Sequence, residues 1–169
     1  MKPEHNSQQE KKPVMDAQKA LNATAALCSK KEYATADIRR KLANWEISPE
    51  DQEKIIDFLQ KNKFLDDSRF ARFYARDKFR FNKWGKQKIA VSLRQKQIDS
   101  NVIAEALNQL ETSDYTDTCL HLLQQKLKHS KETDPIKQKA KLIRFGIGRG
   151  FNYETVLQAL DRLSGKLSL

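Results

Sequence analysis

The chain has 169 residues, of which 38% are hydrophobic and 32% are charged, and its formal net charge is +10. These values suit a soluble protein with one ordinary core or several small ones. No run of about 18 apolar residues occurs, which argues against a membrane span, and the polar start of the chain lacks the apolar core of a signal peptide. We therefore expect a cytoplasmic protein. The charge excess predicts affinity for a polyanion: nucleic acid, an anionic membrane or an acidic protein surface.

Helices are the expected secondary structure throughout. Only 5 glycines and 4 prolines occur, while Lys, Leu, Ala and Gln are abundant, so we predict an all-α fold. Residues 1–15 are polar and lack periodicity, and we expect them to form a disordered tail. A first unit, residues 16–65, contains helices that begin near Asp16, Thr35 and Ser48. The predicted buried face of its third helix consists of Ile55, Phe58 and Leu59.

The second unit, residues 66–111, opens with an aromatic and basic helix. Asp66 and Asp67 stand where carboxylates satisfy free amide donors and complement the helix dipole. At about 100° per residue, aromatic side chains fall on one side of this helix and basic ones on roughly the opposite side. The predicted packed side contains Phe70, Tyr74 and Phe81. The basic stripe consists of Arg69, Arg72, Arg76, Arg80 and Lys83. After a break at Trp84-Gly85, a second helix is predicted to continue this surface with Lys86, Lys88, Arg94 and Lys96.

The units repeat one plan. Four pairs of apolar residues are each 51 positions apart, which indicates a repeat: Ile38 and Ile89, Leu42 and Leu93, Ile47 and Ile98, Leu59 and Leu110. A third unit, residues 112–169, has its second helix from Pro135 to about Gly148. This unit contains a second basic cluster, Lys137, Lys139, Lys141, Arg144 and Arg149. We predict three tandem three-helix repeats, similar to helix-turn-helix units, in an elongated arrangement, because stacked units contact only their neighbours.

Residue types that often carry chemistry have structural explanations here. Capping accounts for the adjacent Asp66 and Asp67, and no third acidic or histidine ligand is spaced to join them. The histidines lack the spacing of an adjacent-turn ligand pair; they are His5, His121 and His129. Cys28 and Cys119 lie in apolar helical segments, which favours buried thiols over a disulfide.

The glycines of the third unit also lack a catalytic pattern. Gly146, Gly148 and Gly150 are not accompanied by the lysine and Ser/Thr of a nucleotide phosphate loop, and no strand precedes them. The sequence also offers no nucleophile beside a base and no metal constellation. We therefore expect no cofactor, no metal site and no enzymatic activity.

A resemblance to a known family rests on three runs, LDDSRFARFYARDKFR, WGKQKIAVSLRQKQI and KAKLIRFGIGRGFNYETV. Together and in this order they resemble the RecX family, regulatory proteins of the RecA recombinase, over about residues 16–163. Gln97 stands where that family usually has glycine, and Gly146 and Gly148 stand where bulkier helix formers are usual. The resemblance implies a curved all-helical protein that lies in the groove of a RecA filament on single-stranded DNA. It also implies that the protein limits filament growth and inhibits its ATPase, recombination and coprotease activities, in DNA repair and the SOS response.

Two other interpretations of the basic residues remain open. The stripe that begins at Arg69 is also compatible with a solvated helix face, but five cations with few acids exceed what solubility requires. The alternative function is a DNA-binding protein that acts on DNA directly, either without sequence preference or in the manner of a helix-turn-helix protein. No helix shows the compact set of Asn, Gln and Arg that indicates base readout, whereas weak non-specific binding agrees with the charge. The expected partner is the RecA filament, with no membrane partner, and we expect a monomer.

Overall fold

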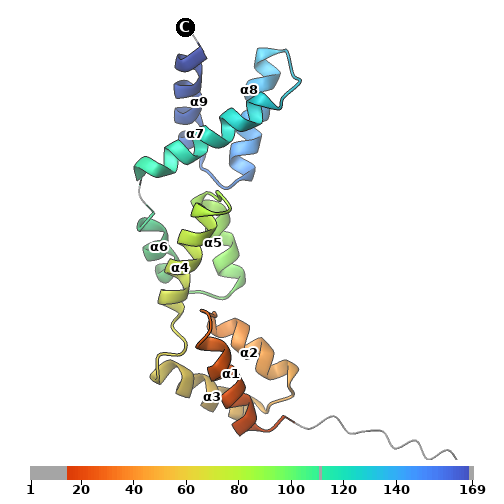
Figure 1. The fold of residues 1–169 in the computed structure, drawn as a ribbon, viewed down its shortest axis with the longest axis vertical. Helices are drawn as coiled ribbons and strands as arrows, with labels where there is room; N and C mark the ends of the chain where they lie inside the picture. Colours follow the sequence, from red (N-terminus) through yellow and green to blue (C-terminus); the bar gives the residue numbers. More distant parts are fainter. Residues whose placement is uncertain (1–14, 111, 168–169) are drawn as a thin grey trace, which may run out of the picture. The chain divides into compact units, whose positions relative to one another are not determined.

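The computed structural model of the chain describes residues 15–110 and 112–167, in which all regular secondary structure is α-helical (Figure 1). The predicted all-α fold is confirmed. The predicted disorder of residues 1–15 falls almost entirely outside the described residues and stays a prediction. The helices are α1 (Ala17–Cys28), α2 (Thr35–Asn44), α3 (Pro49–Lys61), α4 (Asp67–Arg80), α5 (Lys86–Gln95), α6 (Ser100–Asn108), α7 (Thr112–Lys128), α8 (Pro135–Gly148) and α9 (Tyr153–Leu167).

The chain divides into two compact units, the first ending at Leu65 and the second beginning at Asp66. In the first unit, α3 contacts both α1 and α2. Its core is aliphatic because the apolar side chains of the three helices recur at helical spacing. The buried residues of this core include Ile38, Leu42, Ile47, Ile55, Ile56, Leu59 and Leu65.

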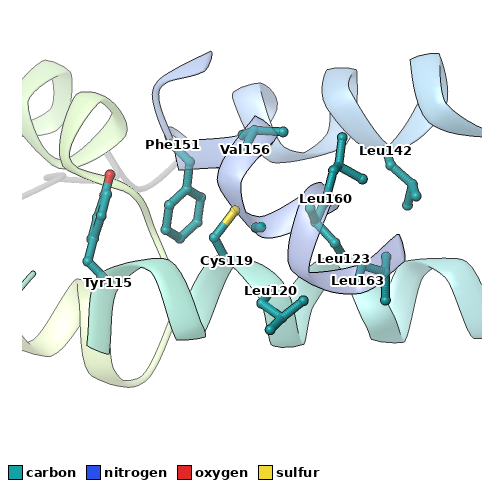
Figure 2. Packing of buried hydrophobic residues seen from close by; sticks show 10 residues of the cluster. Tyr115, Cys119, Leu120, Leu123, Leu142, Phe151, Val156, Leu160 and Leu163 are labelled. Carbon is teal, nitrogen blue, oxygen red and sulfur yellow. The ribbon is translucent and has the colours of Figure 1, made fainter. Parts of the chain in front are cut away.

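The second unit contains α4 to α9. Helix α4 packs against α5 and α6, while α7 packs against α8 and α9. Figure 2 shows the core between the last three helices, with Cys119 of α7 among the side chains of Phe151 and Val156. Burial raises the pKa of the Cys119 thiol to about 11, so this thiol stays protonated and unreactive at neutral pH. The prediction of a buried thiol is confirmed for Cys119, whereas Cys28 is only half-buried.

The helices follow one another as three triplets, α1–α3, α4–α6 and α7–α9, and the second helix of each triplet ends with the same turn geometry. The backbone amide of Glu46 donates to the carbonyl of Ala43, and that of Ile47 donates to the carbonyl of Leu42. This pair of bonds is the Schellman motif, which requires a residue in the left-handed conformation just after the helix cap. The same two bonds follow α5 and α8, and the left-handed residues are Glu46 (φ 59°), Gln97 (φ 59°) and Gly150 (φ 91°). The three second helices therefore share one ending, and the same two bonds also follow α3, where Lys63 adopts φ 61°.

Glycine at position 97 is expected to stabilise the protein. Gln97 adopts φ 59°, where a side chain costs roughly 1–2 kcal/mol, and glycine has no such cost but loses about 0.5–1 kcal/mol through its freedom in the unfolded chain. We expect Gln97→Gly to raise the free energy of unfolding by about 1 kcal/mol in urea denaturation. Gln95→Gly, the same substitution at the last residue of α5, where the backbone is still helical, is the control and should lower it by about 0.5 kcal/mol. A Gln97→Gly variant less stable than the parent would contradict this account.

Two aromatic residues predicted to be buried are exposed instead. Phe81 is 72% exposed because α4 ends at Arg80, which leaves Phe81 as the cap residue beyond the packed turns. Phe58 is 43% exposed. The buried face of α3 is centred on Ile55, Ile56 and Leu59, and the prediction did not include Ile56. At about 100° per residue, Phe58 lies at the flank of the face that buries Ile56.

Candidate partner-binding surface

Helix α4 begins where the paired aspartates predict it. The Oδ1 atom of Asp66 accepts a hydrogen bond from the backbone amide of Arg69 at 2.9 Å, which is an N-cap. This bond, with the nearby charges of Arg69 and Arg72, lowers the pKa of the Asp66 carboxyl below its ordinary value. The carboxylate therefore stays ionised and fixes the start of the helix that presents the basic stripe.

The two faces of α4 are separated as the spacing predicts. Phe70, Ala71 and Ala75 are buried. Four members of the stripe are exposed and Arg69 is half-buried; the exposed members are Arg72, Arg76 and Arg80 of α4, and Lys83, which lies in the turn after α4 ends at Arg80. Within the described residues, the ion pair recorded for the exposed members joins Arg76 Nε to Asp77 Oδ1 at 3.9 Å, and both side chains are well solvated. The exposed part of the stripe, from Arg72 to Lys83, is therefore a strongly cationic surface.

Two hollows lie along the stripe. The first, about 390 Å³, is lined by Arg69, Arg72 and Arg76 on α4 and by residues at the end of α6. The second, about 630 Å³, begins at Arg76 and is lined on its other side by Asp114 and Asp117 of α7, among others. Both share Gln109 and Leu110, so they form one groove along α4. Because carboxylates line only the second part, the first part is the more cationic.

Aromatic side chains are part of the groove. Phe73 is 41% exposed and lines the first hollow, and the guanidinium of Arg76 lies over its ring at 4.8 Å. Leu110 contributes a buried apolar floor. The groove therefore combines cations with apolar surface, a combination that fits a protein segment with acidic and apolar side chains.

Most of the basic residues predicted to continue the stripe along α5 lie against aromatic rings. Lys96 is half-buried with its Nζ 5.6 Å from the ring centre of Phe70, on the side of α4 opposite the stripe. Lys88 Nζ lies 4.8 Å from the ring centre of Trp84, and Lys86 Nζ lies 5.2 Å from that of Tyr115. Arg94 is exposed. Three of these four cations are thus engaged with aromatic rings.

The second predicted basic cluster is divided by the geometry of α8. Its exposed members are Lys137, Lys139, Lys141 and Arg144. At about 100° per residue, Lys137, Lys141 and Arg144 share one face, and Lys139 lies on roughly the opposite face. Arg149 lies apart from this cluster, because its Nη2 donates to the backbone oxygens of Asn82 and Lys83.

Arg149 belongs to a joint between the α4–α6 and α7–α9 triplets that the sequence did not predict. The amide of Gly85 donates to the carbonyl of Arg149 at 2.8 Å, and the amide of Gln87 donates to that of Gly150 at 3.1 Å. The hydroxyl of Tyr115 accepts from the amide of Lys86 at 2.9 Å. A Cβ atom on Gly85 would lie 2.1 Å from the carbonyl carbon of Gly150, so the two backbones touch only because glycine stands there.

Positive charge is concentrated in these two triplets. Residues 66–111 contain ten basic and six acidic side chains, and residues 112–169 also contain ten and six. Residues 16–65 contain nine basic and eight acidic side chains and are nearly neutral. An anionic partner is therefore attracted mainly by the second unit.

Neither a metal-ligand cluster nor a membrane-spanning helix is present in the described part of the chain. Over the described residues, no group of three or more His, Cys, Asp and Glu side chains is arranged to hold a metal ion. In the same part of the chain, no helix is long and apolar enough to cross a membrane.

Comparison with known proteins identifies the family. Residues 66–107 match the second three-helix domain of RecX, and residues 113–160 match the third. A protein named regulatory protein RecX from Prosthecochloris aestuarii is 32% identical over 148 residues, which cover 88% of this chain and 95% of that protein. The protein of the same name from Clostridium acetobutylicum is 33% identical over 131 residues, and the match covers 75% of this chain and 60% of that relative.

Solved structures share the fold. The crystal structure of RecX from Lactobacillus salivarius matches with a TM-score of 0.81 at 20% identity, covering 88% of this chain and 96% of that one. A second structure, titled regulatory protein RecX, matches with a TM-score of 0.80 at 22% identity, covering 86% and 71%. At these identities the structures show the fold alone. The two domain matches and the near full-length match to the Prosthecochloris protein show that this chain belongs to the RecX family.

Proposed function

We propose that this protein regulates the RecA recombinase by binding the filament that RecA forms on single-stranded DNA. In this proposal it limits filament growth and inhibits the ATPase, recombination and coprotease activities of the filament. Membership of a family of regulatory proteins supports a regulatory role, and the resemblance described above supplies RecA as the partner. The protein would act as a cytoplasmic monomer in DNA repair and the SOS response.

The observation that carries the proposal is the exposed cationic face of α4. Arg72, Arg76 and Arg80 project from a helix whose other side is buried, so they are available to an anionic partner at little cost in stability. The groove beside them also contains the exposed ring of Phe73. A protein surface with acidic and apolar groups matches this chemistry better than base edges do, because α4 itself carries no Asn or Gln side chain for base readout and, among the described residues, Gln109 is the one amide side chain lining the groove.

The first test is the ATPase of the RecA from the same organism on single-stranded DNA. We expect the rate of phosphate release to fall as the protein is titrated in, because a bound regulator reduces the amount of active filament. The protein alone should release no phosphate, which is the control. A rate that stays flat through an excess of protein, under conditions where filaments form, would refute the proposal.

A further inference from the structure

A separate cationic hollow of about 280 Å³ lies between the end of α7 and α8. Three exposed lysines line it, Lys126 and Lys131 on one side and Lys141 on the other. The hydroxyl of Ser130 and the imidazole of His129 also line it. Lys126 and Lys131 are not members of the cluster predicted from the sequence, so the fold creates this site by bringing two elements together.

The hollow is held in shape by its connecting turn. The Oγ of Ser130 accepts a hydrogen bond from the amide of Glu132 at 3.3 Å, which leaves its own proton free to donate to a ligand. The side-chain amide of Gln138 donates to the carbonyl of Glu132 at 3.2 Å, which ties the turn to α8. The amide of Asp134 donates to Oε1 of Glu132 at 3.2 Å. These bonds order the turn without a ligand, which lowers the entropic cost of binding.

Nearby carboxylates do not neutralise the hollow. Asp134 caps α8, where its Oδ1 accepts from the amides of Ile136 and Lys137 at 2.9 and 3.2 Å. No acidic side chain lines the hollow, and within residues 15–110 and 112–167 none of its lysines is recorded in an ion pair. Lys126 Nζ does lie 5.3 Å from the ring centre of Phe145, a contact that leaves its charge in place. The dipole of α7 accounts for a lysine in its last turn, such as Lys126, but not for Lys131 or Lys141.

We propose that this hollow binds a phosphate group of a nucleic-acid backbone. Lysine is a common phosphate ligand because it acts as a compact point charge, and a serine hydroxyl adds a directed donor. The face of α8 that carries Lys141 continues with Lys137 and Arg144, so successive phosphates of one strand would meet cations along the helix. The site is distinct from the α4 stripe and does not depend on RecA.

The test measures binding of a fluorescein-labelled single-stranded oligonucleotide to the full chain in the absence of RecA. The variant Lys126→Gln/Lys141→Gln removes two cations from the hollow. The matched control, Lys128→Gln/Lys139→Gln, removes two exposed cations from the same helices, each two positions away and therefore on roughly the opposite face. Both variants should melt like the parent, which separates binding from folding.

Counterion release sets the expected size of the effect. Each phosphate that the protein neutralises on a single strand contributes about 0.7 to the slope of log K against log salt, so loss of the one phosphate held in the hollow should reduce the slope by about 0.7. At about 0.1 M salt this corresponds to roughly fivefold weaker binding for the hollow variant. The control should weaken binding by less than about threefold, through the loss of general attraction alone.

Two results would overturn the proposal. Equal weakening by both variants would show that the chain attracts DNA only through its overall charge. The second result comes from titrations with ATP and with inorganic phosphate, which distinguish a free nucleotide from a nucleic-acid backbone. Binding of ATP that depends on Lys141, without binding of the oligonucleotide, would assign the hollow to a free nucleotide.

Discussion

Alanine in place of Gly85 is expected to destabilise the second unit by about 3 kcal/mol. The added Cβ would lie 2.1 Å from the carbonyl carbon of Gly150 and 2.4 Å from the amide nitrogen of Phe151, and these are backbone atoms that have no rotamer to change. The joint would have to open, which costs the hydrogen bond from Gly85 to Arg149 and the one from Gln87 to Gly150. Each such bond contributes about 1 kcal/mol, and overpacking costs about 1–3 kcal/mol.

Urea denaturation followed by circular dichroism measures this effect, and hydrogen exchange at the Gln87 amide locates it. Gly148→Ala is the matched control, because a Cβ at that position meets no atom within 4 Å. Alanine there should raise the free energy of unfolding by about 0.5–1 kcal/mol, since glycine is a poor helix residue. If Gly85→Ala is as stable as the parent and the Gln87 amide stays protected, the close glycine contact does not hold the joint.

The local features of α4 could be predicted because they depend on neighbours in the sequence. The cap at Asp66 needs only an amide three residues away, and the opposition of Phe70 to Arg72 needs only the helical period. The Schellman turn at Gln97 was harder to predict, because its left-handed residue is usually glycine. The sequence alone does not predict it, because neither Glu46 nor Gln97, which lie 51 residues apart and share this conformation, is glycine.

The joint could not be predicted because its backbone contacts join residues more than 60 positions apart, such as Gly85 and Arg149. Arg149 was assigned to a partner surface on charge alone, yet its guanidinium satisfies backbone carbonyls of the turn after α4. The sequence shows which residues are charged, but only the fold decides whether a charged side chain faces solvent or contacts another turn. The sequence did contain a hint, because Gly85 and Gly150 each follow a large side chain at the edge of a helix.

The hollow at the end of α7 was missed for a related reason. The sequence places cations in order along single helices, and on that basis Lys137, Lys139 and Lys141 belong to one predicted basic cluster. The structure separates Lys139 from Lys141 by the helical period and adds Lys126 from another element. A cluster formed by two helices can be predicted only when it is known which helix ends lie next to each other.

Charge reversal at Arg72 and Arg76 is expected to separate filament binding from stability. Both side chains are exposed, so the double reversal should change the free energy of unfolding by less than about 0.5 kcal/mol per site. It should weaken binding to the RecA filament and flatten the salt dependence of that binding, because two attractive charges become repulsive. Phe70→Ala should instead cost about 3 kcal/mol of stability, because the ring is buried and stacks on Tyr74 at 5.5 Å.

Melting and filament co-sedimentation of both variants at low and high salt measure the two effects. Lys30→Glu/Lys61→Glu is the control for net charge, since both lysines are exposed and lie in the nearly neutral first unit. This control changes the overall charge by the same amount as the α4 reversal but leaves the α4 face intact. It should therefore bind the filament much as the parent does. If the α4 reversal binds and inhibits like the parent at both salt concentrations, the stripe is a solvated face. The contact would then lie elsewhere, with the face of α8 that carries Lys137, Lys141 and Arg144 the next surface to reverse.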